Sequence, residues 1–230
     1  MSVEILPDAD ELAQAMASRL SARVSDIQSE GRTPRIVLTG GTIAVAAYER
    51  IDGSAADWTD VELWFGDERF VPEGHVDRND QQARDAFLDR VGATHVHSVA
   101  GNDCSLSAAE AADEYAATLP DEPFDVVLLG MGPDGHVASL FPQHPLLLET
   151  DRVCAELFDS PKPPPVRISM TFPTLNRTNA VWFLVSGDGK ADAVARALAD
   201  DGSIDETPAR GVQGRQETLW LLDAAAASRT

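Results

Sequence analysis

Apolar residues recur at a spacing of four near the start of the chain. The spacing places them on one face of a helix, which we expect over residues 8–31, with Gly31 as a stop. Farther along, short runs rich in Val, Ile and Leu predict buried strands, and the segments between them predict helices. The expected strands cover residues 35–39, 61–65, 124–129, 152–157, 166–172 and 180–185, and the further helices cover residues 43–50, 80–91, 107–119 and 190–199.

The alternation of strands and helices indicates an α/β protein whose mostly parallel sheet is covered on both faces. The chain has no internal repeat and no low-complexity tract, so we expect one domain over residues 1–230. The later strands follow one another closely, which is compatible with a mixed sheet or with a small β-rich lobe around residues 150–186. The proline-rich segment 160–165 forms a rigid connection within that lobe.

Four segments rich in glycine and charge each follow a predicted strand. They cover residues 40–42, 66–69, 130–136 and 187–190. In open α/β sheets, ligands bind outside the carboxyl ends of the strands, near the point where the strand order reverses. We therefore expect these four loops to converge on one small ligand.

The 18 basic and 38 acidic side chains give the chain a formal charge of −20. This balance argues against a broad surface for nucleic acid or for an anionic membrane. An anionic ligand therefore needs a local concentration of the few cations. Only two of these are lysines, Lys162 and Lys190, a scarcity that we interpret as compositional bias. Two cysteines without CxxC spacing, no visible signal peptide and no long apolar run predict a cytoplasmic protein.

Two of the glycine-rich loops are candidate anion sites. Gly40, Gly41 and Thr42 lie between a strand and a helix, where glycine lets the backbone approach an anion and the helix start offers free N–H groups. An ordinary turn is the alternative at this position. Residues 130–135 match G-x-G-x-x-G, the pattern of dinucleotide sites. Because Asp134 would place negative charge beside a pyrophosphate, we disfavour nucleotide binding there.

A histidine follows that second loop directly. The imidazole of His136 is suited to proton transfer at neutral pH, and Asp134, two residues earlier, can orient it. His75 and Asp77 lie near another acidic stretch, but their spacing fits no specific metal site. We prefer a solvated acidic loop there and expect no metal.

Five motifs occur together in one order: LTGGT at 38–42, FGDERFVP at 65–72, LGMGPDGHVASLFP at 129–142, SPKPPPVR at 160–167 and GDGK at 187–190. With these motifs the chain resembles the 6-phosphogluconolactonase family of the pentose phosphate pathway over nearly its full length. The resemblance implies a Rossmann-like three-layer α/β sandwich, shared with glucosamine-6-phosphate deaminases and related to ribose-5-phosphate isomerase. It also implies hydrolysis of 6-phospho-D-glucono-1,5-lactone to 6-phospho-D-gluconate without a cofactor.

The resemblance further implies roles for single residues. His136 is the general base, Asp67 and Arg69 lie in the catalytic site with Asp134, and the phosphate is held by Gly40, Gly41, Thr42, Arg167 and Lys190. The implied partner is a small-molecule phosphosugar lactone, with no nucleic acid and no membrane. We expect a monomer or a small homo-oligomer.

Two departures from the family pattern affect the expected site. Ile43 and Ala44 follow the first glycine loop, where the family usually has a proline. Arg78 precedes Asn79, where the family commonly has serine, and this places an extra cation near the pocket.

Three alternative functions remain to be weighed. A glucosamine-6-phosphate deaminase or isomerase carries Asn and Glu where this chain has Leu140 and Phe141, and neither apolar side chain can relay a proton. A sugar-phosphate sensor needs an output module, and no segment is left over to supply one. An NAD-dependent dehydrogenase is disfavoured by Asp134.

Overall fold

The computed structural model describes residues 1–230. Its strands are β1 (Ser2–Leu6), β2 (Arg35–Leu38), β3 (Glu62–Phe65), β4 (Asp67–Arg69), β5 (His95–Val96), β6 (Phe124–Gly130), β7 (Cys154–Leu157), β8 (Arg167–Met170), β9 (Thr178–Val185) and β10 (Glu217–Asp223). Its α-helices are α1 (Ala9–Ser29), α2 (Thr42–Glu49), α3 (Asn79–Ala83), α4 (Asp89–Val91), α5 (Ala108–Ala116), α6 (Phe172–Leu175) and α7 (Ala191–Leu198). Short 3₁₀ turns include Asp188–Lys190, which leads into α7.

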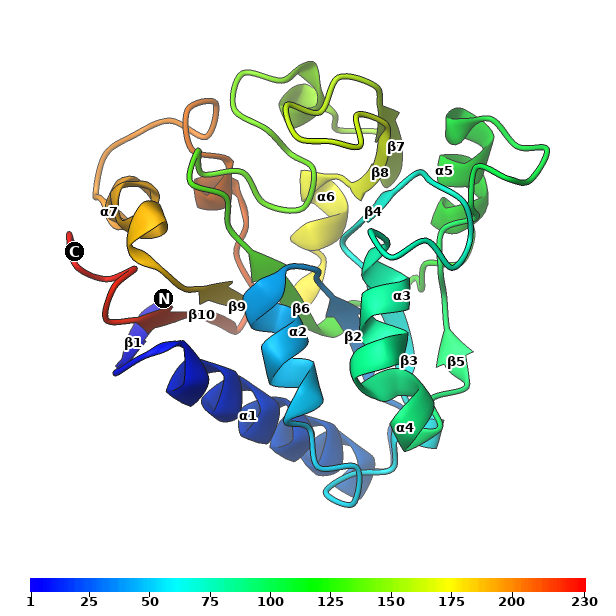
Figure 1. The fold of residues 1–230 in the computed structure, drawn as a ribbon, viewed down its shortest axis with the longest axis horizontal. Coiled ribbons are helices and arrows are strands. Elements are labelled where there is room, and N and C mark those ends of the chain that lie inside the picture. The colour runs from blue at the N-terminus through cyan, green and yellow to red at the C-terminus, as the bar shows by residue number, and fades with distance from the viewer.

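Seven strands form a central sheet in the order β1-β10-β9-β6-β2-β3-β5. Every neighbouring pair in this sheet is parallel. The other three strands form a small antiparallel sheet in the order β4-β8-β7. Figure 1 shows this small sheet on one side of the central one, next to α6.

The inner strands of the central sheet (β2, β3, β6, β9 and β10) send side chains to two separate cores on its two faces. Val181, Phe183 and Val185 of β9 join the core beneath α5 and α7, whereas Trp182 and Leu184 join the core beneath α1 and α2. The sheet therefore lies between two helical layers (Figure 1), and burial on both faces explains why its strands read as continuous apolar runs. This arrangement confirms the α/β sandwich with a mostly parallel sheet.

The strand order reverses beside β2. The chain proceeds from β2 to β3 and β5 on one side, then returns to place β6, β9 and β10 on the other. The loops after β2, β6 and β9 consequently leave the same edge of the sheet around this reversal. That edge is where a ligand crevice is expected.

The structure corrects several sequence-based expectations. The segment 66–69, expected as a loop, contains strand β4 of the small sheet. The expected lobe at 150–186 is only partly right, because β9 belongs to the central sheet. The helix expected over 80–91 contains a π-helical stretch at Arg84–Leu88.

Strands β1, β5 and β10 were not predicted. Two-residue β5 is too short to produce a periodic pattern, and the alternation in β1 covers only a five-residue edge strand that is mostly exposed. The apolar run in β10 is equally compatible with a buried helix when read without its neighbours. No helix combines the length and the apolar character needed to cross a membrane.

Candidate active site

A cavity of about 620 Å³ lies at the edge of the sheet where the strand order reverses. Residues from all four predicted loops line it, together with the proline-rich loop of the small sheet. The lining from these loops and their flanks comprises Thr39, Gly40, Gly41, Thr42, Ile43, Asp67, Arg69, Asn79, Gly130, Met131, Gly132, His136, Ala138, Lys162, Arg167, Ser186 and Lys190. The expected convergence of the four segments is therefore present in the fold.

The cavity is a basic exception in an acidic chain. Its charged lining comprises the four cations Arg69, Lys162, Arg167 and Lys190 and only two acids, Asp10 and Asp67. Both lysines of the chain are among these cations. The scarcity of lysine therefore carries positional information, and our interpretation of it as compositional bias alone was incomplete.

The His136 imidazole is held by a neighbouring carboxylate. Its Nδ1 lies 2.5 Å from Oδ1 of Asp134, and its ring packs against Phe141 at a centroid distance of 4.7 Å. Although partial burial opposes ionisation, the hydrogen bond and charge of His136 hold the pKa of Asp134 well below its usual range. Because an ionised carboxylate only accepts, Nδ1 is the donor and Nε2 keeps a lone pair for a proton. With Asp134 holding its ring, His136 can act as a general base.

Gly132 makes room for this histidine. A Cβ atom at Gly132 would lie 2.0 Å from Nδ1 of His136 and 2.3 Å from Oδ1 of Asp134. Either the ring or the loop must then move. Gly132, one of the glycines that match the dinucleotide pattern, is thus needed to leave space for the His136 imidazole.

We expect Gly132→Ala to lower kcat by about 100-fold, because a displacement of roughly 1 Å in a reacting group has effects of that size. Steady-state kinetics on the folded variant measures this loss. Gly53→Ala is the matched control, since its added Cβ meets only the Val91 side chain, at 3.2 Å and outside the cavity. A normal kcat in Gly132→Ala would show that the observed ring position is not needed for activity.

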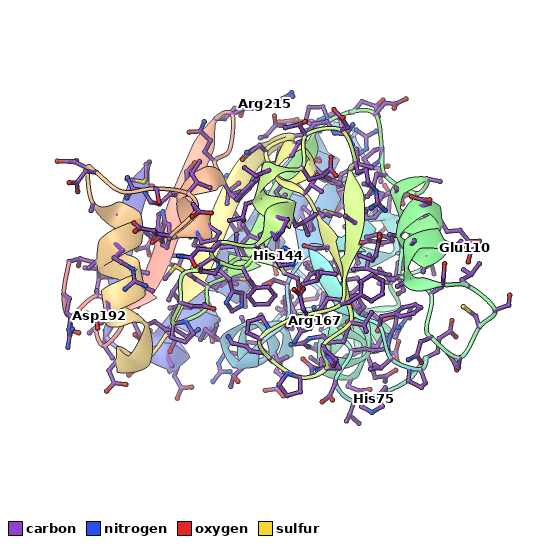
Figure 2. The ribbon with its side chains drawn as sticks, turned by 90° about the horizontal axis from the view of Figure 1, so that it is seen from above. His75, Glu110, His144, Arg167, Asp192 and Arg215 are labelled. Atoms are coloured by element: carbon purple, nitrogen blue, oxygen red, sulfur yellow. The ribbon has the colours of Figure 1, made fainter.

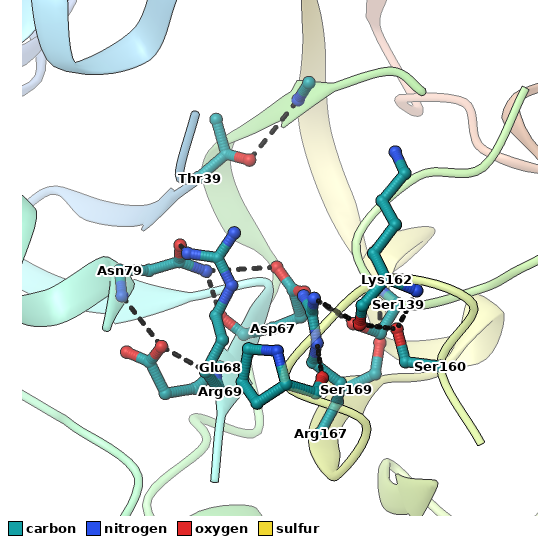
Figure 3. Close-up of polar contacts among 12 residues, drawn as sticks. Thr39, Asp67, Glu68, Arg69, Asn79, Ser139, Ser160, Lys162, Arg167 and Ser169 are labelled. Carbon is teal, nitrogen blue, oxygen red and sulfur yellow. Dashed lines mark hydrogen bonds and ion pairs between the residues drawn. The ribbon is translucent and has the colours of Figure 1, made fainter. Parts of the chain in front are cut away.

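Asp67 connects three parts of the site (Figure 3). Its Oδ2 accepts a hydrogen bond from Ser139 Oγ at 2.6 Å, and its Oδ1 accepts one from Asn79 Nδ2 at 3.2 Å. The Arg167 guanidinium lies 3.8 Å away. With both oxygens engaged, Asp67 is placed to hold its neighbours rather than to abstract a proton.

Arg69 is fixed by two oxygens. Its Nη1 donates to the Asp77 carbonyl and to Asn79 Oδ1, both at 2.7 Å. Its Nε is buried without a protein partner. Asn79 in turn approaches Gly40 so closely that a Cβ there would lie 1.8 Å from Asn79 Oδ1. The loop after β2 and the start of α3 are therefore packed directly against each other.

Glu68 lies beneath this group and is almost fully buried. Its carboxylate accepts hydrogen bonds from the backbone amides of Arg69, Asn79 and Asp80 at 2.7–2.9 Å. Burial and the Asp80 carboxylate raise the pKa of Glu68 to about 7, against the opposing effect of Arg78 and the donated amides.

We expect this carboxyl to make stability fall with rising pH. Its pKa is 4.5 ordinarily and about 7 in the fold, so the folded state binds more protons between those values. The unfolding free energy should therefore drop by about 3 kcal/mol as pH rises through this window. Urea unfolding at several pH values measures it, and Glu68→Gln should flatten the profile. A wild-type profile that is level or rising there contradicts the expectation.

The phosphate-binding candidates occupy two sides of the cavity. Gly41 (φ 101°) and Gly187 (φ 97°) adopt backbone angles that favour glycine, and each precedes a helical segment that starts at the cavity. Lys190 follows Gly187, and its Nζ donates to the Met131 carbonyl. Burial, reinforced by Lys162, lowers the pKa of Lys190. Such desolvated ammonium groups gain most from an anionic partner.

Arg167 is more constrained than the sequence suggested. It lies on β8 opposite Arg69, and its guanidinium donates to the carbonyls of Lys162, Pro163 and Pro164 at 3.0–3.2 Å. It therefore shapes the proline-rich loop as well as lining the cavity. In Figure 3 the Lys162 side chain extends from that loop, and its ammonium has no hydrogen-bond partner in the protein.

Arg78 and His75 both lie outside the cavity, and only the placement of Arg78 near the pocket was wrong. Arg78 adds no cation to the pocket, because its guanidinium is buried against Asp80 at 2.8 Å and the carbonyls of Val71 and Val99. His75 lies exposed at the edge of the molecule (Figure 2), 3.8 Å from Asp77. Ile43, the other departure, does line the cavity.

Several lining residues were missed from the sequence. Lys162 stands in a quoted motif but was not assigned to the site; its rarity was the available signal. Asn79 and Ser139 act through the contacts with Asp67 described above. Contacts between segments so far apart in the chain leave no local pattern in the sequence. Thr39 also lines the cavity, and its Oγ1 accepts a hydrogen bond from the Gly130 amide at 3.3 Å.

Comparisons with known proteins find relatives that span most of the chain. The family described as glucosamine-6-phosphate isomerases/6-phosphogluconolactonase matches residues 7–220. A 6-phosphogluconolactonase of Streptomyces coelicolor is 45% identical over 240 residues, spanning 96% of this chain and 92% of that protein. One of Mycobacterium tuberculosis is 46% identical over 99% of this chain and 98% of that protein. The solved 6-phosphogluconolactonase of Trypanosoma brucei superposes with a TM-score of 0.86 at 26% identity, spanning 99% and 97% of the chains.

Proposed function

The chain belongs to the glucosamine-6-phosphate isomerase/6-phosphogluconolactonase family, and we propose that it hydrolyses 6-phospho-D-glucono-1,5-lactone to 6-phospho-D-gluconate. The observation that carries this proposal is the His136–Asp134 pair, 2.5 Å apart, in a cavity lined by four cations. Hydrolysis of this lactone requires a general base and, near it, cations that can bind the phosphate group. It makes the protein a hydrolase of the oxidative pentose phosphate pathway.

The reaction needs one water and one proton relay. Nε2 of His136 takes a proton from the water while the water oxygen attacks the lactone carbonyl carbon. The tetrahedral oxyanion forms near N–H donors of the glycine loops and near Arg69. The bond from that carbon to the ring oxygen then breaks, and the imidazolium returns its proton to the leaving oxygen. Neither a metal nor an organic cofactor is required by these steps.

Asp134 keeps the imidazole ready for both proton transfers. It fixes the tautomer with Nε2 free and stabilises the imidazolium between the two steps. Asp67 holds Asn79 and Ser139 in place and lies near Arg167, so it organises the floor of the site. This division of labour assigns proton transfer to the histidine alone.

The phosphate is bound away from the reacting carbon. Lys190, Lys162 and Arg167 supply charge, and Gly40, Gly41 and Thr42 supply amides at the start of α2. Binding energy from this remote group orients the lactone for attack.

The deaminase or isomerase alternative is not favoured by relatives of this chain, which are named 6-phosphogluconolactonases. At the positions where a carboxylate relay would be needed, Leu140 and Phe141 are buried, and Phe141 packs on the His136 ring. An apolar ring in that place cannot carry a proton. The site therefore lacks that chemistry.

We further propose a single domain over residues 1–230 that acts in the cytoplasm as a monomer or a small homo-oligomer, without nucleic acid or a membrane as partner. The formal charge of −20 supports the absence of polyanionic partners. Cys104 and Cys154 are unpaired thiols, as is usual in a reducing compartment.

The test compares two lactones. We expect rapid hydrolysis of freshly made 6-phosphoglucono-δ-lactone above its spontaneous rate, and a much lower kcat/KM for unphosphorylated gluconolactone, because only the first carries a phosphate for Lys162, Arg167 and Lys190 to bind. Proton release measured in weak buffer follows both reactions. Equal kcat/KM values on the two lactones would contradict the proposed substrate.

A further inference from the structure

The chain has only two tyrosines, and both are used in the same way. The Tyr48 hydroxyl accepts from the Thr39 amide at 3.0 Å and donates to the Thr39 carbonyl at 2.8 Å. The Tyr115 hydroxyl accepts from the Phe65 amide at 2.7 Å and donates to the Phe65 carbonyl at 2.8 Å. Each hydroxyl thus occupies both polar groups of one residue, as a neighbouring strand would.

Tyr48 acts where β2 and β6 separate. The ladder between these strands contains only the pairs Ile36–Val126 and Val37–Val127, and it ends before Thr39. The Leu38 carbonyl is bonded to the Gly66 amide on the β3 side, so the alternation of a parallel strand turns Thr39 toward β6. There the tyrosine, reaching in from α2, takes the place of the missing partner. The next residue is Gly40, which lines the cavity.

Tyr115 acts where β5 has ended. The β3–β5 ladder stops after Leu63–Val96, with one further bond from the His97 amide to the Leu63 carbonyl. Phe65, two residues beyond Leu63, faces the same side and has no strand opposite it. The hydroxyl of Tyr115, from α5 on the other face of the sheet, fills that place. Gly66 and the segment Asp67–Arg69 follow directly.

We propose that Tyr48 and Tyr115 are positioning residues of the active site. They fix Thr39, just after β2, and Phe65, the last residue of β3, so that the two site loops, residues 40–42 and 66–69, leave the sheet at set places. Neither tyrosine lines the cavity. Tyr48 acts through Thr39 on Gly40, Gly41 and Thr42. Tyr115 acts through Phe65 on Asp67 and Arg69.

Pairing with both the N–H and the C=O of one residue requires a hydroxyl group. It donates and accepts through one atom, whereas phenylalanine of the same shape does neither. Burial raises the pKa of both phenols above their ordinary value, so each keeps the proton that it donates. Removing either hydroxyl leaves a buried N–H and a buried C=O unpaired at the start of a site loop.

The kinetic test uses Tyr48→Phe and Tyr115→Phe and rests on the proposed function for its assay. Because a loosened loop misplaces the groups it carries, we expect about a 10-fold loss of kcat/KM in each variant. The loss in Tyr48→Phe should appear mainly as a higher KM for the phosphorylated lactone. The loss in Tyr115→Phe should appear mainly as a lower kcat.

Val24→Ala is the control for a general loss of stability. Val24 is fully buried in α1, in the same core as Tyr48, and touches neither site loop. It should lower Tm by several degrees, as the tyrosine variants should, yet keep both kinetic constants within about twofold of wild type. If the tyrosine variants lose Tm but also keep both constants within that range, the hydroxyls only stabilise the fold and the proposal is wrong.

Hydrogen exchange of the wild-type protein tests the same idea without a variant or a substrate. We expect the amide protons of Thr39 and Phe65 to exchange as slowly as those of Val37 and Leu63 inside the strands, although both residues lie at strand ends. Exchange as fast as that of Gly41 would overturn the proposal. An inactive wild type with slow exchange would instead refute the proposed function and leave the positioning role supported.

Discussion

His136→Ala is expected to lower kcat by roughly 10²–10⁴-fold in a protein that remains folded, the range typical of a lost general base. The reason lies in the geometry, because Asp134 holds Nδ1 at 2.5 Å and leaves Nε2 as the free basic nitrogen in the cavity. No other histidine lines that cavity. Steady-state hydrolysis of the phosphorylated lactone, corrected for the spontaneous rate, measures the effect.

The chain provides a matched control in His144. That imidazole is similarly shielded and also pairs with a carboxylate, with Nε2 3.0 Å from Asp159, but it lies outside the cavity. His144→Ala should therefore leave kcat near its wild-type value. If His136→Ala keeps a rate within about threefold of wild type, another group activates the water and the assigned base is wrong.

Lys190→Met is expected to raise KM for the phosphorylated lactone by about 10–150-fold, because a charge-assisted hydrogen bond contributes roughly 1.5–3 kcal/mol. Methionine keeps the length and apolar stem of the side chain while it removes the charge. Lys162→Met should act in the same direction, since the Lys162 side chain also lines the cavity and its ammonium has no protein hydrogen-bond partner. KM and kcat on both lactones separate phosphate binding from catalysis.

The unphosphorylated lactone provides the internal comparison for this second prediction. Its slow rate should change little in Lys190→Met, because it carries no group for that ammonium to bind. Arg196→Met removes a positive charge from α7 outside the cavity and should leave both substrates unaffected. An equal loss on the two lactones in Lys190→Met would mean that the residue supports the fold or the chemistry instead.

The core of the fold could be predicted because its signals are local. Apolar runs such as residues 126–129 and 180–185 occur where a strand is buried on both faces, and runs of this kind identified β2, β3, β6 and β9. The glycine-rich segments after them were placed at strand ends, and strand ends of a parallel sheet share one edge. Proximity of the four loops therefore followed from topology alone.

What could not be predicted depends on packing between distant segments. Whether Arg78 faces the pocket is decided by Val71, Asp80 and Val99, which close around its guanidinium. Lys162 reaches the cavity only because the small antiparallel sheet brings its loop over the end of the central one. Neither outcome leaves a periodic signal in the sequence.

The pairing of β1 with β10 determines when the molecule can be completed during synthesis. Ser2 lies opposite Leu219 and Leu6 opposite Asp223, so β1 cannot pair until β10 has been synthesised. Until then α1 follows an unpaired strand, and the edge of β9 that β10 will occupy is open to other chains. Contacts so distant along the chain form slowly. The nascent chain therefore carries β1 unpaired until β10 is made, and the step that pairs them comes after the site loops have all been made.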